Sequence, residues 1–376
     1  MYRIPFNKPH SSPLELSYIS ECLEQNKLSG DGAFSERCHA FFEREFGFQK
    51  ALLTTSCTDA LELSALLLRI GPGDEVILPS FTFVSTANAF ALRGAKLVFA
   101  DSGVREPNIT PETIEPLITP RTKAIVVVHY AGVACDMDPI LAMAKRHGIA
   151  VVEDAAQAFD SYYRGRPLGG LGSLGAFSFH ETKNVSCGEG GLIAINDDAF
   201  AHRAEILREK GTNRSAFFRG EVDKYGWVDI GSSFLPSDIL AAYLFAQLER
   251  SADIQKKRRW IWETYYQAMQ DVTSYGIQLP YVPDYATNNG HMFYMLCTDI
   301  DQRDRVIAGL KRKGAQATFH YISLHSSPYF HTNHDGRPLP ECERYSACLV
   351  RMPFYYDLSK DDIQFVAETV LDSLRS

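Results

Sequence analysis

Seven short apolar runs alternate with helix-length segments through the first part of this chain. The runs lie at residues 51–54, 75–79, 97–101, 124–129, 149–154, 176–179 and 192–195. Amphipathic stretches separate several of them, at residues 60–69, 83–92 and 137–147. Continuous apolar strands with helices between them are typical of a sheet whose two faces are both covered. The pattern therefore predicts an α/β fold built on a mixed, mostly parallel sheet with helices on both faces.

The pattern changes in the last third of the sequence. Residues 236–262 read as one long helix or a pair of helices, and a patch rich in Pro, Asn and Gly follows Pro280. A strand-like run at 292–298 and a helix at 303–313 come next. A chain of 376 residues is long enough for two domains. We expect a large α/β domain over residues 1–250, N-terminal segment included, and a smaller α+β domain over residues 251–376.

Composition narrows the function classes. The net charge of −8 argues against nucleic-acid binding and against a basic membrane-surface role. The eight cysteines are scattered without CxxC spacing, which suits free thiols in a reducing compartment better than disulfides or a metal site. The N-terminus has no apolar signal core, and no apolar stretch is long enough to span a bilayer. We expect a cytoplasmic protein without a metal.

A lysine and a carboxylate stand at two predicted strand ends. Asp154 closes the run at 149–154, and Lys183 follows the run at 176–179 by a few residues. Ligands of open α/β sheets bind beyond the carboxyl ends of the strands. Pyridoxal phosphate chemistry needs such a pair, because a lysine holds the cofactor as a Schiff base and a carboxylate keeps the pyridine nitrogen protonated. Taken singly, the lysine could be a solvated surface charge and the aspartate a helix cap.

Neighbouring residues strengthen the cofactor interpretation. Ser178 offers a hydroxyl to a phosphate, and Gln157 stands three residues after Asp154. Residues 54–60 place small hydroxyl side chains before a predicted helix, where a phosphate can bind, although an ordinary N-cap explains them equally well. Residues 188–191 form a glycine-rich turn that lets the backbone approach a ligand. No GxGxxG turn follows the first strand, which argues against a nicotinamide cofactor.

In this order along the chain, the motifs resemble those of the DegT/DnrJ/EryC1/StrS sugar aminotransferases, which have fold type I of the pyridoxal phosphate enzymes. The specific pair is EDAAQ at residues 153–157 and SFHETK at residues 178–183. The likeness extends from residue 30 to Met352 and Pro353. Within the family, residues 84–90 and 210–215 are most similar to transaminases acting on dTDP-4-keto-6-deoxyglucose. Such enzymes make dTDP-4-amino-4,6-dideoxygalactose for enterobacterial common antigen, and related sugars serve O-antigen and lipopolysaccharide biosynthesis.

The resemblance implies a role for each matching residue. Lys183 would form the Schiff base, Asp154 would pair with the pyridine nitrogen, and Gln157 would lie near the phenolic oxygen. Phe83 would stack on the ring. The phosphate would be held by Ser178 and by the backbone of Cys57 and Thr58. His320 and Tyr321 would lie near the nucleotide-sugar.

Two positions depart from the family pattern. The family often has Gly-Thr where this chain has Cys57-Thr58, so a Cβ is expected to crowd the turn. The asparagine that relatives contribute from the partner subunit is absent, which leaves Ser233 as a weaker phosphate ligand across the interface. The resemblance thus implies a homodimer with its active site between subunits.

The implied reaction is transfer of an amino group from L-glutamate to a nucleotide-linked 4-keto-6-deoxyhexose. The products would be a 4-amino-4,6-dideoxy sugar of galacto configuration and 2-oxoglutarate. A gluco product, a 3-keto substrate, and a UDP- or GDP-linked sugar stay open, as do a sugar dehydratase and a non-catalytic relative. Some relatives that are dehydratases carry histidine in place of the lysine, so Lys183 favours transamination.

Overall fold

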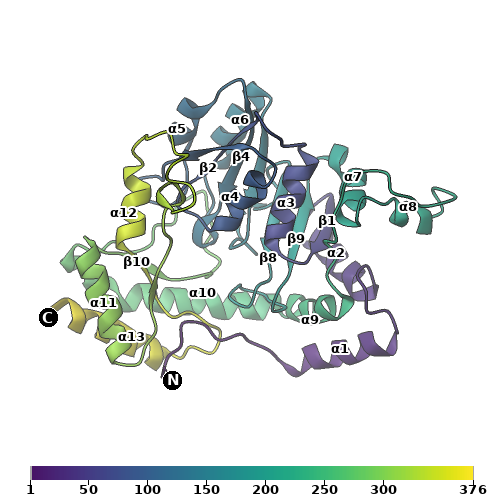
Figure 1. The fold of residues 1–376 in the computed structure, drawn as a ribbon. Coiled ribbons are helices and arrows are strands. Elements are labelled where there is room, and N and C mark those ends of the chain that lie inside the picture. The colour runs from purple at the N-terminus through teal and green to yellow at the C-terminus, as the bar shows by residue number, and fades with distance from the viewer. Residues whose placement is uncertain (1, 376) are drawn as a thin grey trace.

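A seven-stranded sheet forms the centre of the computed structural model, which describes residues 2–375 (Figure 1). The strand order is β1-β9-β8-β5-β4-β2-β3. The strands are β1 (Lys50–Thr54), β2 (Glu75–Pro79), β3 (Lys96–Ala100), β4 (Thr122–Val128), β5 (Ala150–Asp154), β8 (Leu174–Ser178) and β9 (Gly191–Ile195). Each coincides within a residue or two with one of the predicted runs. Only β9 runs antiparallel to its neighbours, so the predicted mixed, mostly parallel sheet is confirmed.

Helices cover both faces of this sheet, as predicted. Along β4 the residues alternate between two hydrophobic cores, with Val126 in one and Ile125 and Val127 in the other. The helices on the first core are α3 (Cys57–Leu67), α4 (Val84–Ala91) and α7 (Asp198–Arg208). Those on the second are α2 (Ala33–Phe46), α6 (Met137–His147) and α9 (Asp238–Glu249). Strands buried on both faces explain why the sequence reads as continuous apolar runs.

Shorter elements complete this part of the chain. They are α1 (Pro13–Glu24), α5 (Pro111–Ile114), α8 (Arg214–Phe218) and the hairpin of β6 (Tyr162–Tyr163) with β7 (Arg166–Pro167). Helix α1 packs along α9 below the sheet (Figure 1). No helix among residues 2–375 is long and apolar enough to cross a membrane.

The C-terminal residues form a separate three-stranded antiparallel sheet of order β10-β12-β11. Its strands are β10 (Tyr294–Leu296), β11 (Thr318–Phe319) and β12 (Leu349–Arg351), and its helices are α10 (Ser251–Ala268), α11 (Ile300–Arg312), α12 (Pro340–Cys348) and α13 (Lys360–Arg375). The predicted helix at 236–262 is a pair, since α9 ends at Glu249 and α10 begins at Ser251. Ile4 bonds with Gly314 and Gln316, so the N-terminal segment lies against this part of the chain. The division at residue 250 stays a prediction.

Strand direction brings the candidate residues together. Strands β1, β8, β5 and β4 run the same way and end at Thr54, Ser178, Asp154 and Val128. Opposite Thr54 and Ser178, the register places Gly191, the first residue of β9. One edge of the sheet therefore carries the tips from which the site is built.

Candidate active site

A cavity of about 660 Å³ opens at this edge of the sheet. Nine of the ten residues expected from the sequence line it: Cys57, Thr58, Phe83, Asp154, Gln157, Ser178, Lys183, His320 and Tyr321. They come from both sheets and from the N-termini of α3 and α4. The volume suits a cofactor together with part of a substrate.

Asp154 is a buried carboxylate at the tip of β5, with a side chain held by two donors. Thr86 Oγ1 donates to Oδ2 at 2.7 Å, and the Ala156 amide donates to Oδ1 at 3.1 Å. Burial raises the pKa of Asp154, and these hydrogen bonds with the charge of Lys183 oppose the rise. No basic side chain of residues 2–375 lies within ion-pair distance of this carboxylate. It is poised to pair with a cation in the cavity.

Lys183 lies in the loop that joins β8 to β9. Its amide donates to the His180 carbonyl at 2.9 Å, and the Phe179–Gly190 and Phe179–Cys187 backbone bonds close the loop. Burial lowers the pKa of the Lys183 amine, while Asp154 and Cys57 oppose the fall. A lowered pKa increases the share of neutral amine, which is the nucleophilic and basic form.

Asn184, the next residue, anchors this loop to the C-terminal part of the chain. Its amide nitrogen donates to Gln255 Oε1 at 2.8 Å and to the Asn289 carbonyl at 3.0 Å. Its oxygen lies 2.8 Å from His291 Nδ1, and because an amide oxygen can only accept, Nδ1 carries the proton and donates. Nε2 of His291, a buried residue that lines the cavity, is then an acceptor.

An anion-binding corner lies where α3 begins. Ser56 caps the helix through a 3.1 Å bond from the Asp59 amide, and Cys57 and Thr58 are its first two residues. The first amides of a helix have no partner within it and favour an anion. A Cβ on Gly191 would lie 2.5 Å from the Cys57 nitrogen, so a glycine there lets β9 pack against the helix start. Ser178, opposite Gly191 in the sheet, lines the same corner.

Gln157 spans two sides of the cavity. Its Oε1 accepts from the Ala131 amide at 2.6 Å, and its Nε2 donates to the Tyr321 hydroxyl at 3.2 Å. Phe83 is 56% exposed and its ring lies 6.2 Å from that of Tyr321, whereas Phe81 is buried against Tyr321 and Tyr130. Of these two phenylalanines, only Phe83 lines the cavity.

His320 links a tyrosine to an arginine. Its Nδ1 lies 2.9 Å from the Tyr130 hydroxyl, and Arg351 Nη1 lies 3.2 Å from its Nε2. A guanidinium can only donate, so Nε2 accepts and the ring is neutral. Burial first, then the charges of Arg351 and Lys183, hold the pKa of His320 well below its usual range.

One expected residue lies elsewhere. Ser233 lines a separate surface groove with Lys210 and Arg214, not the cavity. His129, which also ends a predicted strand, is fully buried and bonds Glu153 at 2.9 Å. The Cys135 amide donates to its other nitrogen, so His129 supports the structure.

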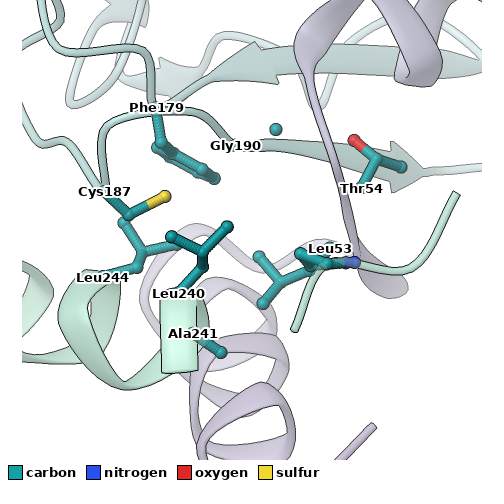
Figure 2. Close-up of a pocket in the computed structure, with 10 residues that line it drawn as sticks. Leu53, Thr54, Phe179, Cys187, Gly190, Leu240, Ala241 and Leu244 are labelled. Atoms are coloured by element: carbon teal, nitrogen blue, oxygen red, sulfur yellow. The ribbon is translucent and has the colours of Figure 1, made fainter. Parts of the chain in front are cut away.

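A second void lies behind the loop that carries Lys183 (Figure 2). Phe179 and Cys187 face Leu240, Ala241 and Leu244 of α9 across it. Its volume is about 10 Å³, at the lower limit for one water, and its walls are apolar. It is a packing defect and holds no ligand site.

Residues missed by sequence reasoning complete the cavity wall, among them Phe6, Thr86, His291 and Arg351. Arg351 directly precedes Met352, at the end of the family likeness, which was a usable signal. Thr86 lies within residues 84–90, another part of the family likeness, whereas Phe6 and His291 come from segments without a motif. Among residues 2–375, no group of three or more His, Cys, Asp or Glu side chains could hold a metal.

The residues fit pyridoxal phosphate. A protonated pyridine nitrogen suits the buried, unpaired Asp154, and a phosphate suits the corner at Cys57, Thr58 and Ser178. Lys183 opens on the same cavity, and Phe83 offers an exposed ring to stack on. This arrangement can bind an aromatic cation at one end and its anionic group at the other.

Comparisons with known proteins agree with this geometry. The model of the DegT/DnrJ/EryC1/StrS aminotransferase family matches residues 10–371. A spore coat polysaccharide biosynthesis protein, SpsC of Bacillus subtilis, is 35% identical over 99% of this chain and 97% of its own length. The aminotransferase TlmJ of Streptoalloteichus hindustanus is 31% identical, with a TM-score of 0.90 over 100% of this chain and 99% of that one. DesV of S. venezuelae is 29% identical, with a TM-score of 0.90 over 100% of both chains. The chain therefore belongs to the DegT/DnrJ/EryC1/StrS aminotransferase family and has fold type I of the pyridoxal phosphate enzymes.

Proposed function

We propose that this protein transfers the amino group of L-glutamate to a nucleotide-linked 4-keto-6-deoxyhexose. The substrate is dTDP-4-keto-6-deoxy-D-glucose, and the products are 2-oxoglutarate and the 4-amino-4,6-dideoxy sugar of galacto configuration. One observation carries the proposal: Lys183, Asp154 and the anion-binding corner at α3 open on a single cavity. The closer likeness of residues 84–90 and 210–215 supports the choice of sugar.

The cofactor supplies an electron sink that stabilises negative charge at the donor's Cα. Asp154 keeps the ring nitrogen protonated, because a buried carboxylate without a protein cation favours a bound one. Lys183 would hold the cofactor, and its neutral amine would take the proton from the donor's Cα as the general base. Its lowered pKa supports this role, since a neutral amine accepts a proton.

Phosphate binding involves Ser178 and the backbone of Cys57 and Thr58, while Phe83 and Gln157 hold the ring. His320 and Tyr321 line the same cavity, and we assign them to the sugar nucleotide. Retention of Lys183 favours transamination over dehydration. Each alternative reaction would give a different product. These products are a 4-amino sugar of gluco configuration, a 3-amino sugar, a UDP- or GDP-linked amino sugar, or a dehydrated sugar.

The enzyme works as a homodimer with its site at the subunit interface. Ser233 lies outside its own cavity, which suits a residue that serves the partner's site. Apolar side chains near it are unusually exposed, with Trp227 at 83% and Leu92 at 69%. Burial of such a surface against a second copy would stabilise the pair.

The test is to incubate the purified holoenzyme with dTDP-4-keto-6-deoxyglucose and L-glutamate. Mass spectrometry should detect the aminated sugar nucleotide together with 2-oxoglutarate. Proton coupling constants should then show an axial C4 amine. A dehydrated sugar would refute the transamination, and so would the absence of any aminated sugar from an enzyme that holds its cofactor. An equatorial amine would refute only the proposed stereochemistry.

A further inference from the structure

His291 is a buried histidine that lines the cavity and has no task in the mechanism described above. It lies three residues before β10, in the segment that leads from α10 to the small sheet. Its amide donates to Asn289 Oδ1 at 2.9 Å, and its carbonyl accepts from Arg258 Nη2 at 2.7 Å. Both backbone groups are bonded, so the imidazole is carried on a fixed part of the cavity wall.

The two ring nitrogens of His291 differ. Nδ1 donates to Asn184 Oδ1 at 2.8 Å. Nε2 has no hydrogen-bond partner among residues 2–375, and it is not one of the unpartnered atoms that the protein shields completely. Burial, and then the nearby positive charges with Lys183 first among them, hold the pKa of His291 well below its usual range. The ring is therefore neutral, and Nε2 presents a lone pair to the cavity.

The amine of Lys183 is a matching donor for this lone pair. It lines the same cavity, and no described residue accepts a hydrogen bond from it. Among the charged groups that lower the pKa of His291, Lys183 acts most strongly, ahead of Arg258, whose guanidinium contacts the His291 carbonyl. Asn184 follows Lys183 directly and binds the other side of the imidazole, so the loop and the ring are held together.

We propose that Nε2 of His291 accepts a hydrogen bond from the free amine of Lys183 and thereby positions the general base. The amine uses a proton for this bond, so its own lone pair stays available to take the proton from the donor. An ammonium donates more strongly than an amine, so the bond strengthens as Lys183 becomes protonated. The inference rests on the proposed transamination, and it adds a residue that acts on Lys183 and on neither substrate.

Two substitutions separate the functions of the two ring nitrogens. His291→Asn places an amide nitrogen near the position of Nδ1, so it can keep the donor to Asn184 but removes the acceptor at Nε2. His291→Gln is the matched control, because its longer side chain can place an amide oxygen near the position of Nε2. Thermal melting should show that both variants fold, since the backbone bonds with Asn289 and Arg258 do not involve the ring.

The pKa of Lys183 can be followed without the cofactor. An acceptor stabilises the ammonium more than the neutral amine, so His291→Asn should lower the pKa of Lys183 further. In the cofactor-free chain, trinitrobenzenesulfonate should label Lys183 of the variant with a midpoint about one pH unit below that of the native chain. Mass spectrometry locates the label. A variant that merely opened the cavity to water would move the midpoint upward, because burial is the main cause of the lowered pKa.

Kinetics distinguishes a bond to Lys183 from a bond to a substrate. Lys183 is the base in both half-reactions, so His291→Asn should slow single turnovers with glutamate and with the sugar nucleotide by a similar factor, roughly tenfold or more. The half-saturating concentrations should stay within about twofold, and His291→Gln should be less impaired. The isotope effect with glutamate deuterated at Cα should increase. A loss confined to one substrate would place Nε2 against that substrate and overturn the assignment.

A further measurement leaves the histidine intact. In the cofactor-free chain labelled with ¹⁵N-histidine, the Nε2 resonance of His291 should move when Lys183→Ala removes the donor. The same resonance position in both proteins would overturn the hydrogen bond, whatever the stability of the His291 variants.

Failure of this inference differs from failure of the proposed function. If no amino donor reacts but the labelling midpoint of Lys183 depends on His291, the transamination fails and the hydrogen bond stands. If the enzyme transaminates and the native chain and His291→Asn share one midpoint, the hydrogen bond is refuted and the proposed function stands.

Discussion

Thr86 and Asp154 are joined by a 2.7 Å hydrogen bond between Oγ1 and Oδ2, inside the protein and 68 residues apart in sequence. Thr86 is fully buried near the start of α4, and Thr82 lies 2.9 Å from its hydroxyl. The bond fixes the carboxylate at the tip of β5 and favours its ionised form. Thr86 of α4 thus helps to keep the Asp154 carboxylate negatively charged where it faces the cavity.

Loss of that hydroxyl should weaken cofactor binding. Thr86→Val keeps the shape but removes the donor, so the pKa of Asp154 rises further and less of the carboxylate is ionised. We expect pyridoxal phosphate to bind roughly tenfold or more weakly, the worth of a hydrogen bond to a charged group. Fluorescence titration measures this affinity, and Thr86→Ser should restore it. A valine variant that binds like the native protein would show that the bond is dispensable.

Asp154→Asn should separate cofactor binding from turnover. The amide keeps the size of the side chain but cannot hold the pyridine nitrogen protonated, so the ring withdraws electrons less well. The holoenzyme should form, with turnover lower by on the order of 10²–10³-fold, a typical cost of losing one preorganised electrostatic contact. Steady-state kinetics measures the change. An unchanged kcat would remove the electron-sink role.

The bonds made by Asn184 should position Lys183. Asn184→Ala removes two donors and one acceptor that tie the loop to Gln255, Asn289 and His291. We expect kcat to fall on the order of tenfold while the cofactor stays bound, because the loop carrying the base is less well placed. Asn184→Asp keeps the acceptor for His291 but turns a carboxylate oxygen toward the acceptors of Gln255 and Asn289, so it should be at least as impaired. Protein with full activity but a lower melting temperature would assign Asn184 to stability alone.

Stability should depend on pH through Glu106. Burial, with a contribution from Asp136, raises the pKa of this carboxyl from 4.5 to about 6, and its Oε2 has no hydrogen-bond partner among the described residues. A raised pKa stabilises the fold below the unfolded value of 4.5, and this contribution is lost as pH rises through 6. The loss amounts to about 2 kcal/mol by pH 8.

Glu106→Gln is the matched control, since Tyr285 can still donate to Oε1 as it does at 3.3 Å in the native chain. Urea unfolding between pH 4.5 and 8 should show the native protein losing stability relative to the variant as pH rises. Parallel curves for the two proteins would mean that Glu106 is solvated and titrates normally.

The sequence predicts the sheet well because its strands are buried on both faces. A run such as residues 124–128 is apolar throughout, so it stands out without any tertiary information. Asp154, Ser178 and Lys183 could be placed from it, because parallel strands carry their ends to one edge. The helix break at Arg250 could not be placed, since no glycine or proline marks it.

The contacts between the two sheets could not be predicted. Phe81 and Phe83 look alike in sequence, and only packing against Tyr130 and Tyr321 buries the first and leaves the second 56% exposed. The contact of Arg351 with His320 depends on the pairing of β11 and β12, two very short strands. Elements of two or three residues carry too little periodicity to be read.

Lys183 is the residue that we propose binds the cofactor. Borohydride reduction of the holoenzyme fixes pyridoxal phosphate to its lysine, and peptide mapping by mass spectrometry then locates the label. The label should fall on Lys183 alone, and Lys183→Ala should show no label, no visible cofactor absorbance and no turnover. A label on another lysine, or a Lys183→Ala variant that still transaminates, would contradict the account.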